Sequence, residues 1–575
     1  MRSGPVRLLS RNRFTKDHFN KNGFVLVRFL LASTKRQPAS LQNPTTLIRS
    51  PVTPTTLSSD QRLADTIGKS TLFGIVASGA QIGTRLVTVP VVIHHLGLGG
   101  YGIWSIIMVT AAYMRFGSAG IKSAFQKYVA EATGNGDFQT ANKLLSTGSI
   151  SMLLLSVAGL VPAVLLAPKL ARASGVPAEF LSAAASSITV LAAIYVVSNF
   201  GSAFEAIVMG GHRVDLTRKY STVLTVCEAA VIIAMLHFGY GLLAMTLIMG
   251  TSELIYIFLC YQASHHILPD MHISVSNFTR EVFPELIRFA GSYQLVNVLE
   301  LLYGSILPIV ILKFFGAEAA GVLAVTARVV ASALIAQDAL VLPILSGGTM
   351  VFASGSTEQM RLFLAKSFKA TLAAALLPLS FVAAFGTVMI FAWTGEADPR
   401  FQTTLWLIAL ASLLRAVSLL QLILYRASGR ALLDNIRQVL RIAAILVVAV
   451  LGRRIGFNGV LAGMAVAELV GVVFMFFAMA ATFRAFSARI VARDAVRVSL
   501  ASALIIGAGV IAGMVPIPWA MTERLAATVK LGEIAMGCLI VAWPVLVFTR
   551  SISTAEKRTV LAMIPHRRVA LATSK

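Results

Sequence analysis

Charged side chains occur inside long apolar runs of this 575-residue sequence, where a charge is costly unless it meets a partner or water. Three arginines, Arg85, Arg328 and Arg415, lie deepest in these runs. A guanidinium group stays charged at physiological pH and offers paired donors that match phosphate oxygens. We therefore expect Arg85 and Arg328 to bind an anionic ligand. Arg415 is a further candidate for the same substrate-binding role. The alternative for all three arginines is a structural ion pair with a carboxylate.

Three carboxylates in or near the same runs, Asp338, Glu300 and Glu205, are the candidates for binding a proton or Na⁺. Asp338 lies ten residues after Arg328, almost three helical turns, so a continuous helix would place both on one face. We expect Asp338 to couple ion binding to Arg328, with Glu300 and Glu205 next. Permanent salt bridges are the alternative for all three.

Other chemistry is disfavoured. No Gly-rich loop followed by Lys and Ser or Thr is present, as nucleotide binding would require. Residues 262–285 contain three histidines and Asp270, but no helical pair of metal ligands. We therefore expect a solvated linker there, and no metal site, cofactor or enzymatic activity.

The elements that position these charges are membrane-spanning helices. Apolar residues make up 57% of the sequence and charged residues 13%, and the mean hydropathy is +0.79. A membrane span needs roughly 20 apolar residues, which allows about fourteen spans and predicts an all-α integral membrane protein. The runs cover 71–93, 101–121, 145–167, 180–208, 220–238 and 241–261, then 286–312, 318–343, 368–393, 401–425, 436–452 and 456–482, and finally 497–515 and 530–548.

The first twelve runs form two copies of one six-helix unit. The segment from Pro90 to Gly102 returns as the segment from Pro308 to Gly321, about 218 residues later. Because six runs separate the copies, both enter the membrane in the same orientation, as in the parallel repeats of some secondary transporters. Pro90 and Pro308 are repeat counterparts inside spans, so we expect each to be a hinge, with a static kink as the alternative.

Basic residues predict the orientation. Most of the 49 lysines and arginines fall on the side of the membrane that holds both termini, which is then cytoplasmic. The formal charge of +24 accordingly indicates topology and attraction to anionic membrane lipid, not nucleic-acid binding. The predicted organisation is a basic, disordered tail at 1–70 (a transit peptide is the alternative), a first lobe at 71–261, a linker at 262–285, a second lobe at 286–482, an additional helix pair at 483–548 and a basic tail at 549–575.

One part of the sequence resembles a known family. The stretch from Arg85 to Trp104 contains the turn Leu-Gly-x-x-x-Tyr-Gly-x-Trp, and Phe125-Gln-Lys-Tyr-Val-Ala-Glu131 and Gly136-Asp137 follow it. These residues resemble the opening of the bacterial polysaccharide-transport family, the Wzx-type O-antigen and exopolysaccharide flippases. That family belongs to the multidrug/oligosaccharidyl-lipid/polysaccharide (MOP) exporter superfamily, and the resemblance covers residues from about 70 to 480.

The resemblance implies a MATE-like fold, with two six-helix lobes around a central cavity and ion-coupled alternating access. It implies transfer of a polyprenyl-pyrophosphate-linked oligosaccharide across a bacterial inner membrane. Its partners would be membrane lipid, the lipid-linked oligosaccharide and the polymerase and chain-length machinery. A lipid II flippase and a multidrug/cation antiporter of the same fold remain alternatives. A membrane polysaccharide polymerase is disfavoured because the predicted outer loops are short.

Overall fold

The structure is a computed structural model of the chain. It describes residues 57–211, 213–353, 356–427, 431–482, 488–515 and 522–551. Residues 1–56 and 552–575 of the two predicted tails lie outside these ranges, whereas 57–70 begin helix α2, so the prediction of disorder is wrong for that part. The chain divides into two compact units, residues 1–61 and 62–575, and the site and the contacts below belong to the second.

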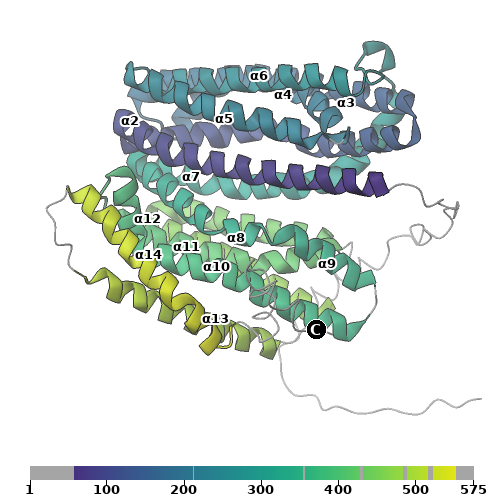
Figure 1. Cartoon of the computed structure of the whole chain (residues 1–575). Helices are drawn as coiled ribbons and strands as arrows, with labels where there is room; N and C mark the ends of the chain where they lie inside the picture. Colours follow the sequence, from purple (N-terminus) through teal and green to yellow (C-terminus); the bar gives the residue numbers. More distant parts are fainter. Residues whose placement is uncertain are drawn as a thin grey trace, which may run out of the picture. The chain divides into compact units, whose positions relative to one another are not determined.

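The described part of the chain is helical and contains no β-strand, as the sequence predicts (Figure 1). Two single-turn 3₁₀ helices, η2 (Val275–Asn277) and η3 (Arg280–Val282), lie between the halves. The α-helices are α2 (Leu57–Asn135), α3 (Phe138–Ala173), α4 (Ala178–Gly210), α5 (Val214–His237), α6 (Leu242–Ile267), α7 (Phe283–Ala333), α8 (Ile335–Asp338), α9 (Val341–Ala353), α10 (Thr357–Thr394), α11 (Arg400–Ala427), α12 (Ala431–Thr482), α13 (Ala488–Gly513) and α14 (Glu523–Phe548).

Among the described residues, 12 stretches are long and apolar enough to cross a membrane. Gly79–Met114 and Val298–Ala333 are two of the three stretches with 36 residues, almost twice the length of one crossing. Each is interrupted by a glycine with non-helical dihedral angles, Gly97 (φ 70°, ψ 169°) or Gly316 (φ 88°, ψ 178°). Each therefore contributes two arms, which brings the total to about fourteen spans, in agreement with the prediction.

The backbone confirms the internal repeat. Gly97 and Gly316 occupy equivalent positions in the two copies and share the same left-handed φ. Gly175 (φ 85°) and Gly395 (φ 81°) form a second such pair, and Gly239 (φ 83°) and Gly456 (φ 72°) a third. Since glycine adopts positive φ without the steric penalty of a side chain, each copy reverses direction at the same three places. These six turns define the Gly97 end of the bundle.

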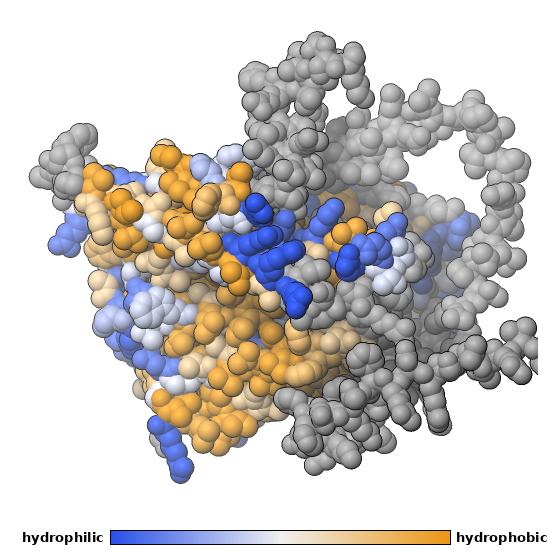
Figure 2. All heavy atoms as spheres, turned by 90° about the horizontal axis from the view of Figure 1, so that it is seen from below, coloured by the Kyte–Doolittle hydropathy of each residue, from blue (hydrophilic) through white to orange (hydrophobic). Residues whose placement is uncertain are grey.

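Helix packing separates two lobes. In the first, α3 packs on α4, and α6 packs on α4 and α5; in the second, α12 packs on α7 and α11, and α10 on α11. Helices α13 and α14 pack on each other and on α10, so the additional pair belongs with the second lobe (Figure 1). Figure 2 shows broad apolar areas on the face that it views. Side chains such as Ile511 and Leu539 of this pair are 69% exposed, as expected for residues that contact lipid.

The eighth predicted span, 318–343, is not one helix. Helix α7 ends at Ala333, and the chain continues as the short helix α8 and then α9. Pro343 is the third residue of α9. Because proline has no N–H to donate, it is tolerated in the first turn of a helix but not in its interior, so a helix passing through 343 must restart just before it.

The linker between the lobes is not simply solvated. Helix α6 extends to Ile267, and the residues after it lie along α3. Asn142 donates to the carbonyl of Asp270 (2.8 Å) and accepts from the backbone of His272 (3.0 Å). Ser146 accepts from the backbone of Ser274 (3.0 Å). Buried polar groups of α3 thus fasten the linker to the first lobe.

Candidate functional site

Two cavities meet at the predicted arginine pair. One, of about 370 Å³, lies among both arms of α2 and helices α5 and α6. The other, of about 390 Å³, lies among α2, α7, α10 and α14. Arg85 of the first lobe and Arg328 of the second line both cavities. The structure thus brings together two arginines that the sequence analysis selected independently in the two repeats.

Arg85 and Arg328 form no ion pair with any residue that the structure describes. Their guanidinium groups are close enough for their charges to repel each other. Tyr101, a buried residue of the Leu-Gly-x-x-x-Tyr-Gly turn, lines the first cavity beside both guanidinium groups. Tyr101 is uncharged and neutralises neither arginine, so two positive charges remain available to a ligand.

The linings of the two cavities differ. The first includes amide and hydroxyl side chains, among them Gln81, Thr84 and Ser105. The second is mostly apolar, with Leu86 from α2 and Leu531 from α14 on its wall. A molecule bound across the arginine pair would therefore meet hydrogen-bonding groups on one side and an apolar space on the other.

The interior of the first lobe holds a polar cavity of about 340 Å³ that contains Glu205. The carboxylate of Glu205 pairs with Lys122 at 2.5 Å, and Tyr256 lines the same cavity. The neighbouring Glu253 accepts from Ser198 at 2.5 Å. Glu205, one of the three predicted ion-binding carboxylates, is therefore neutralised by a lysine in this conformation.

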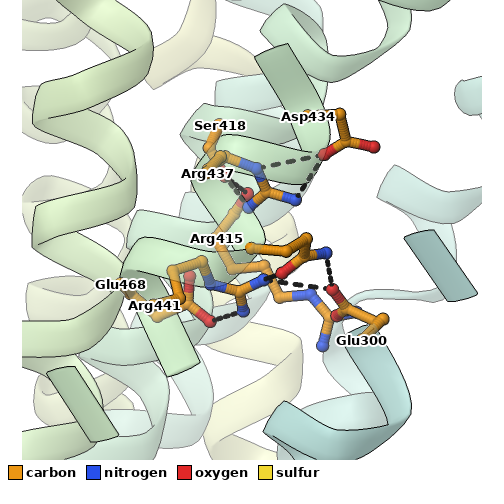
Figure 3. Close-up of polar contacts among 8 residues, drawn as sticks. Glu300, Arg415, Ser418, Asp434, Arg437, Arg441 and Glu468 are labelled. Carbon is orange, nitrogen blue, oxygen red and sulfur yellow. Dashed lines mark hydrogen bonds and ion pairs between the residues drawn. The ribbon is translucent and has the colours of Figure 1, made fainter. Parts of the chain in front are cut away.

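The second lobe holds a network of buried charges that includes Glu300 and Arg415 (Figure 3). Glu300 of α7 contacts Arg415 of α11 through Oε1 at 2.7 Å and Arg441 of α12 through Oε2 at 3.0 Å. Gln438 also donates to Oε2. The Arg415 side chain is 57% exposed, whereas that of Arg441 is fully buried. Glu300 therefore has one exposed partner, Arg415, and one buried partner, Arg441.

Arg441 is the centre of this network. It pairs with Glu468, which is 1% exposed, on the second arm of α12 (Figure 3). Its guanidinium carbon lies 3.8 Å from the ring centre of Tyr303, a cation–π contact. Gly471 makes room for its aliphatic stem, because a Cβ there would lie 3.0 Å from the Arg441 Cδ. One side chain thus links α7 to both arms of α12.

The structure does not place Asp338 beside Arg328. The prediction that they share a helical face is wrong, because the helix ends at Ala333 and Asp338 belongs to α8. The positive charge that acts on the Asp338 carboxylate is that of Arg415. Gln337 fixes α8 against α11 by donating to the carbonyl of Ala416 at 3.4 Å. Asp338 and Glu300 therefore both lie near Arg415.

Sequence reasoning missed four members of this network. Asp434, Arg437, Gln438 and Arg441 are all buried on α12. Their i, i+3, i+4 and i+7 spacing places them on one helical face, a signal that could have identified them. Only Asp434 precedes the predicted span, which starts at 436, whereas the helix begins at Ala431; the other three lie inside that span.

Comparison with known proteins identifies the fold. No family model and no curated protein sequence matches the chain. Among solved structures, the lipid II flippase MurJ in an inward closed conformation matches 84% of this chain and 99% of its own, with a TM-score of 0.65 and 14% identity. An inward-facing multidrug resistance MATE family transporter of the MOP superfamily matches 71% of this chain and 98% of its own, with a TM-score of 0.58 and 15% identity. The chain therefore has the fold of MOP superfamily transporters.

An outward-facing solved structure has the same fold. An outward-facing MATE family transporter covers 72% of this chain and 96% of its own, at 16% identity, but its TM-score is 0.50. The inward-facing MATE structure reaches 0.58 over a similar share of the chain. Within this chain, the two lobes contact each other closely at Gly102 and Gly321, at the Gly97 end.

Proposed function

We propose that this protein is a flippase that transfers a polyprenyl-pyrophosphate-linked oligosaccharide from the cytoplasmic to the periplasmic leaflet of a bacterial inner membrane. The two lobes would expose the arginine pair alternately to the two sides. Both termini would lie in the cytoplasm, so the Gly97 end would face the periplasm. The products would supply O-antigen, exopolysaccharide or capsule assembly, with a polymerase and chain-length machinery as partners.

The observation that carries this proposal is the pair Arg85 and Arg328, unpaired within the described residues and located where a polar cavity meets an apolar one. A pyrophosphate is at least doubly negative, and guanidinium groups hold its oxygens with paired donors. The polar cavity suits a sugar, and the apolar cavity suits the first part of a polyprenyl chain. The sugar, the pyrophosphate and the polyprenyl chain follow one another in the same order as the polar cavity, the arginine pair and the apolar cavity.

Lipid II transfer is the second candidate. The MurJ structure matches a larger share of this chain than the MATE structure does, 84% against 71%. Lipid II also carries a pyrophosphate, so the arginine pair alone does not separate it from other lipid-linked sugars. A multidrug/cation antiporter is a weaker candidate, because the two arginines of the first cavity outnumber Glu228, the one carboxylate among its lining residues, and would repel a cationic drug.

Purified protein in lipid vesicles tests the proposal with three probes: a fluorescent polyprenyl-pyrophosphate oligosaccharide, fluorescent lipid II and the cationic dye ethidium. The amount of each probe that crosses the bilayer is measured with a membrane-impermeant quencher or by dye uptake. We expect transfer of the oligosaccharide lipid in preference to the other two. Faster transfer of lipid II would favour the second candidate, and transfer of ethidium alone would overturn the proposal.

A further inference from the structure

Pro90 leaves one backbone carbonyl of α2 without its helical donor. In an α-helix the N–H of residue 90 would donate to the carbonyl of residue 86. Pro90 lies inside α2 and has no N–H, so the carbonyl of Leu86 lacks this bond. At the depth of a membrane span, such a group needs another partner.

The partner comes from the other lobe. The indole Nε1 of Trp393, close to the C-terminal end of α10, donates to the carbonyl oxygen of Leu86 at 2.7 Å. Both residues line the apolar cavity, and Leu86 directly follows Arg85. The bond therefore connects the two lobes at the Leu86 carbonyl, which Pro90 leaves without a helical donor. This carbonyl lies one residue after Arg85, which is expected to bind the anion.

Trp393 is held in place by the additional helix pair. Arg524, in the first turn of α14, donates from Nε to the carbonyl of Ala392 at 3.1 Å and from Nη2 to the carbonyl of Trp393. Gly395, with a φ of 81°, ends α10 by donating to the carbonyl of Phe391 at 2.8 Å. These hydrogen bonds hold the end of α10 in place. Through Trp393, helix α14 is therefore linked to α2.

We propose that the bond from Trp393 to Leu86 is an inter-lobe latch. It closes when the lobes meet at the Gly97 end, and it must break when they separate there. Water entering the opened cavity then hydrates the carbonyl that Pro90 leaves exposed. In this role Trp393 is a positioning residue: its indole N–H sets the balance between the two orientations. This inference rests on the proposed alternating access.

A distance measurement tests the latch without any transported substrate. Spin labels are attached at Tyr240→Cys, in the turn between α5 and α6, and at Ala397→Cys, in the turn between α10 and α11. Cys227, Cys260 and Cys538 are first replaced by alanine. Both turns lie at the Gly97 end, so the distance between the labels grows when the lobes separate there. Electron spin resonance gives the fractions of the short and the long distance.

Trp393→Phe removes the indole donor and keeps an aromatic ring. A net hydrogen bond is worth roughly a two- to tenfold change in an equilibrium, so we expect the ratio of long to short distances to rise by that factor. The matched control is Trp406→Phe. Trp406 also donates its indole N–H, to the carbonyl of Ala383 at 2.9 Å, but both residues lie in the second lobe. This control should leave the ratio unchanged.

Pro90→Ala completes the test, because alanine restores an N–H that bonds to the Leu86 carbonyl within α2. In that background Trp393→Phe should have a smaller effect than in the natural sequence, which a double-mutant cycle measures. Arg524→Gln should shift the ratio in the same direction as Trp393→Phe, by a smaller factor. An equal ratio in Trp393→Phe and Trp406→Phe would overturn the latch, whatever the protein transports. A shifted ratio in a protein that moves no lipid-linked oligosaccharide would instead contradict the proposed function alone.

Discussion

Gly102 and Gly321 are repeat counterparts that lie against each other at the contact between the two lobes. A Cβ on Gly102 would lie 2.5 Å from the backbone nitrogen of Gly321, and a Cβ on Gly321 would overlap the carbonyl of Leu98. Only hydrogen fits between these backbones. The lobes can therefore close at this end because both copies of the repeat have a glycine at the same place.

Alanine at Gly321 should prevent that closure. Because the added methyl group collides with backbone atoms, we expect the equilibrium to shift towards lobes separated at the Gly97 end. The spin-label distance between positions 240 and 397 measures the shift. Gly304→Ala in α7 is the matched control, since a Cβ there meets nothing within 4 Å. A short distance retained in Gly321→Ala would show that closure tolerates a side chain.

Arg441→Leu should destabilise the second lobe strongly. The substitution leaves the buried carboxylate of Glu468 without its cation, and breaking a buried pair in this way costs about 3–5 kcal/mol. Thermal unfolding in detergent, followed by the loss of the monodisperse peak on size-exclusion chromatography, measures the effect. Arg361→Leu removes a partner of an exposed pair, with Glu358 at 2.9 Å, and should change stability by less than about 1 kcal/mol. Equal melting temperatures for the two variants would contradict this role of Arg441.

Asp338→Asn should uncouple transport from an imposed proton or Na⁺ gradient while the substrate still binds. Glu205 already has a close cationic partner in Lys122. Glu300 has two, Arg415 and Arg441. The Asp338 carboxylate makes no ion pair within 4 Å among the described residues, so it can change its proton or ion occupancy at lower cost. Gradient-driven transfer in vesicles is the measurement. Wild-type gradient dependence in the Asn variant would transfer the coupling role to Glu300 or Glu205.

Reporter fusions test the membrane orientation. Fusions after residues 97, 315 and 397 end at turns of the Gly97 end and should report the periplasmic side. The physical reason is the concentration of basic residues at the opposite ends of the spans. A cytoplasmic signal at any two of these positions would reverse the proposed topology and, with it, the side to which the cavity opens.

The fold could be predicted from the sequence because it depends on features that hydropathy and repetition record. The apolar runs give the number of spans, and the repeated segment after Pro90 and Pro308 gives the two lobes and their parallel orientation. The positive φ at Gly97 and Gly316 explains why that segment repeats, since glycine is needed for the turn. Those two prolines lie inside α2 and α7, and their role as hinges remains a prediction.

The pairing of charges could not be predicted in the same way. Glu300 and Arg441 are 141 residues apart, and only the packing of α7 on α12 brings them together. Asp338 was assigned to Arg328 on the assumption of a continuous helix, which α7 does not provide. The bond between Trp393 and Leu86 joins the two lobes, so local sequence patterns contain no information about it.

Transfer of a lipid-linked oligosaccharide by arginine variants tests the central claim most directly. Arg85→Ala and Arg328→Ala are compared in vesicles with Arg361→Ala, which removes a surface arginine outside both cavities, at equal protein content. Because each cavity arginine is expected to hold the pyrophosphate, losing either should cost about 2 kcal/mol or more, a fall in transfer rate of at least roughly thirtyfold. Lysine at either position should restore only part of the rate, because an ammonium lacks the paired donors. Transfer by both alanine variants at the rate of Arg361→Ala would contradict the claim.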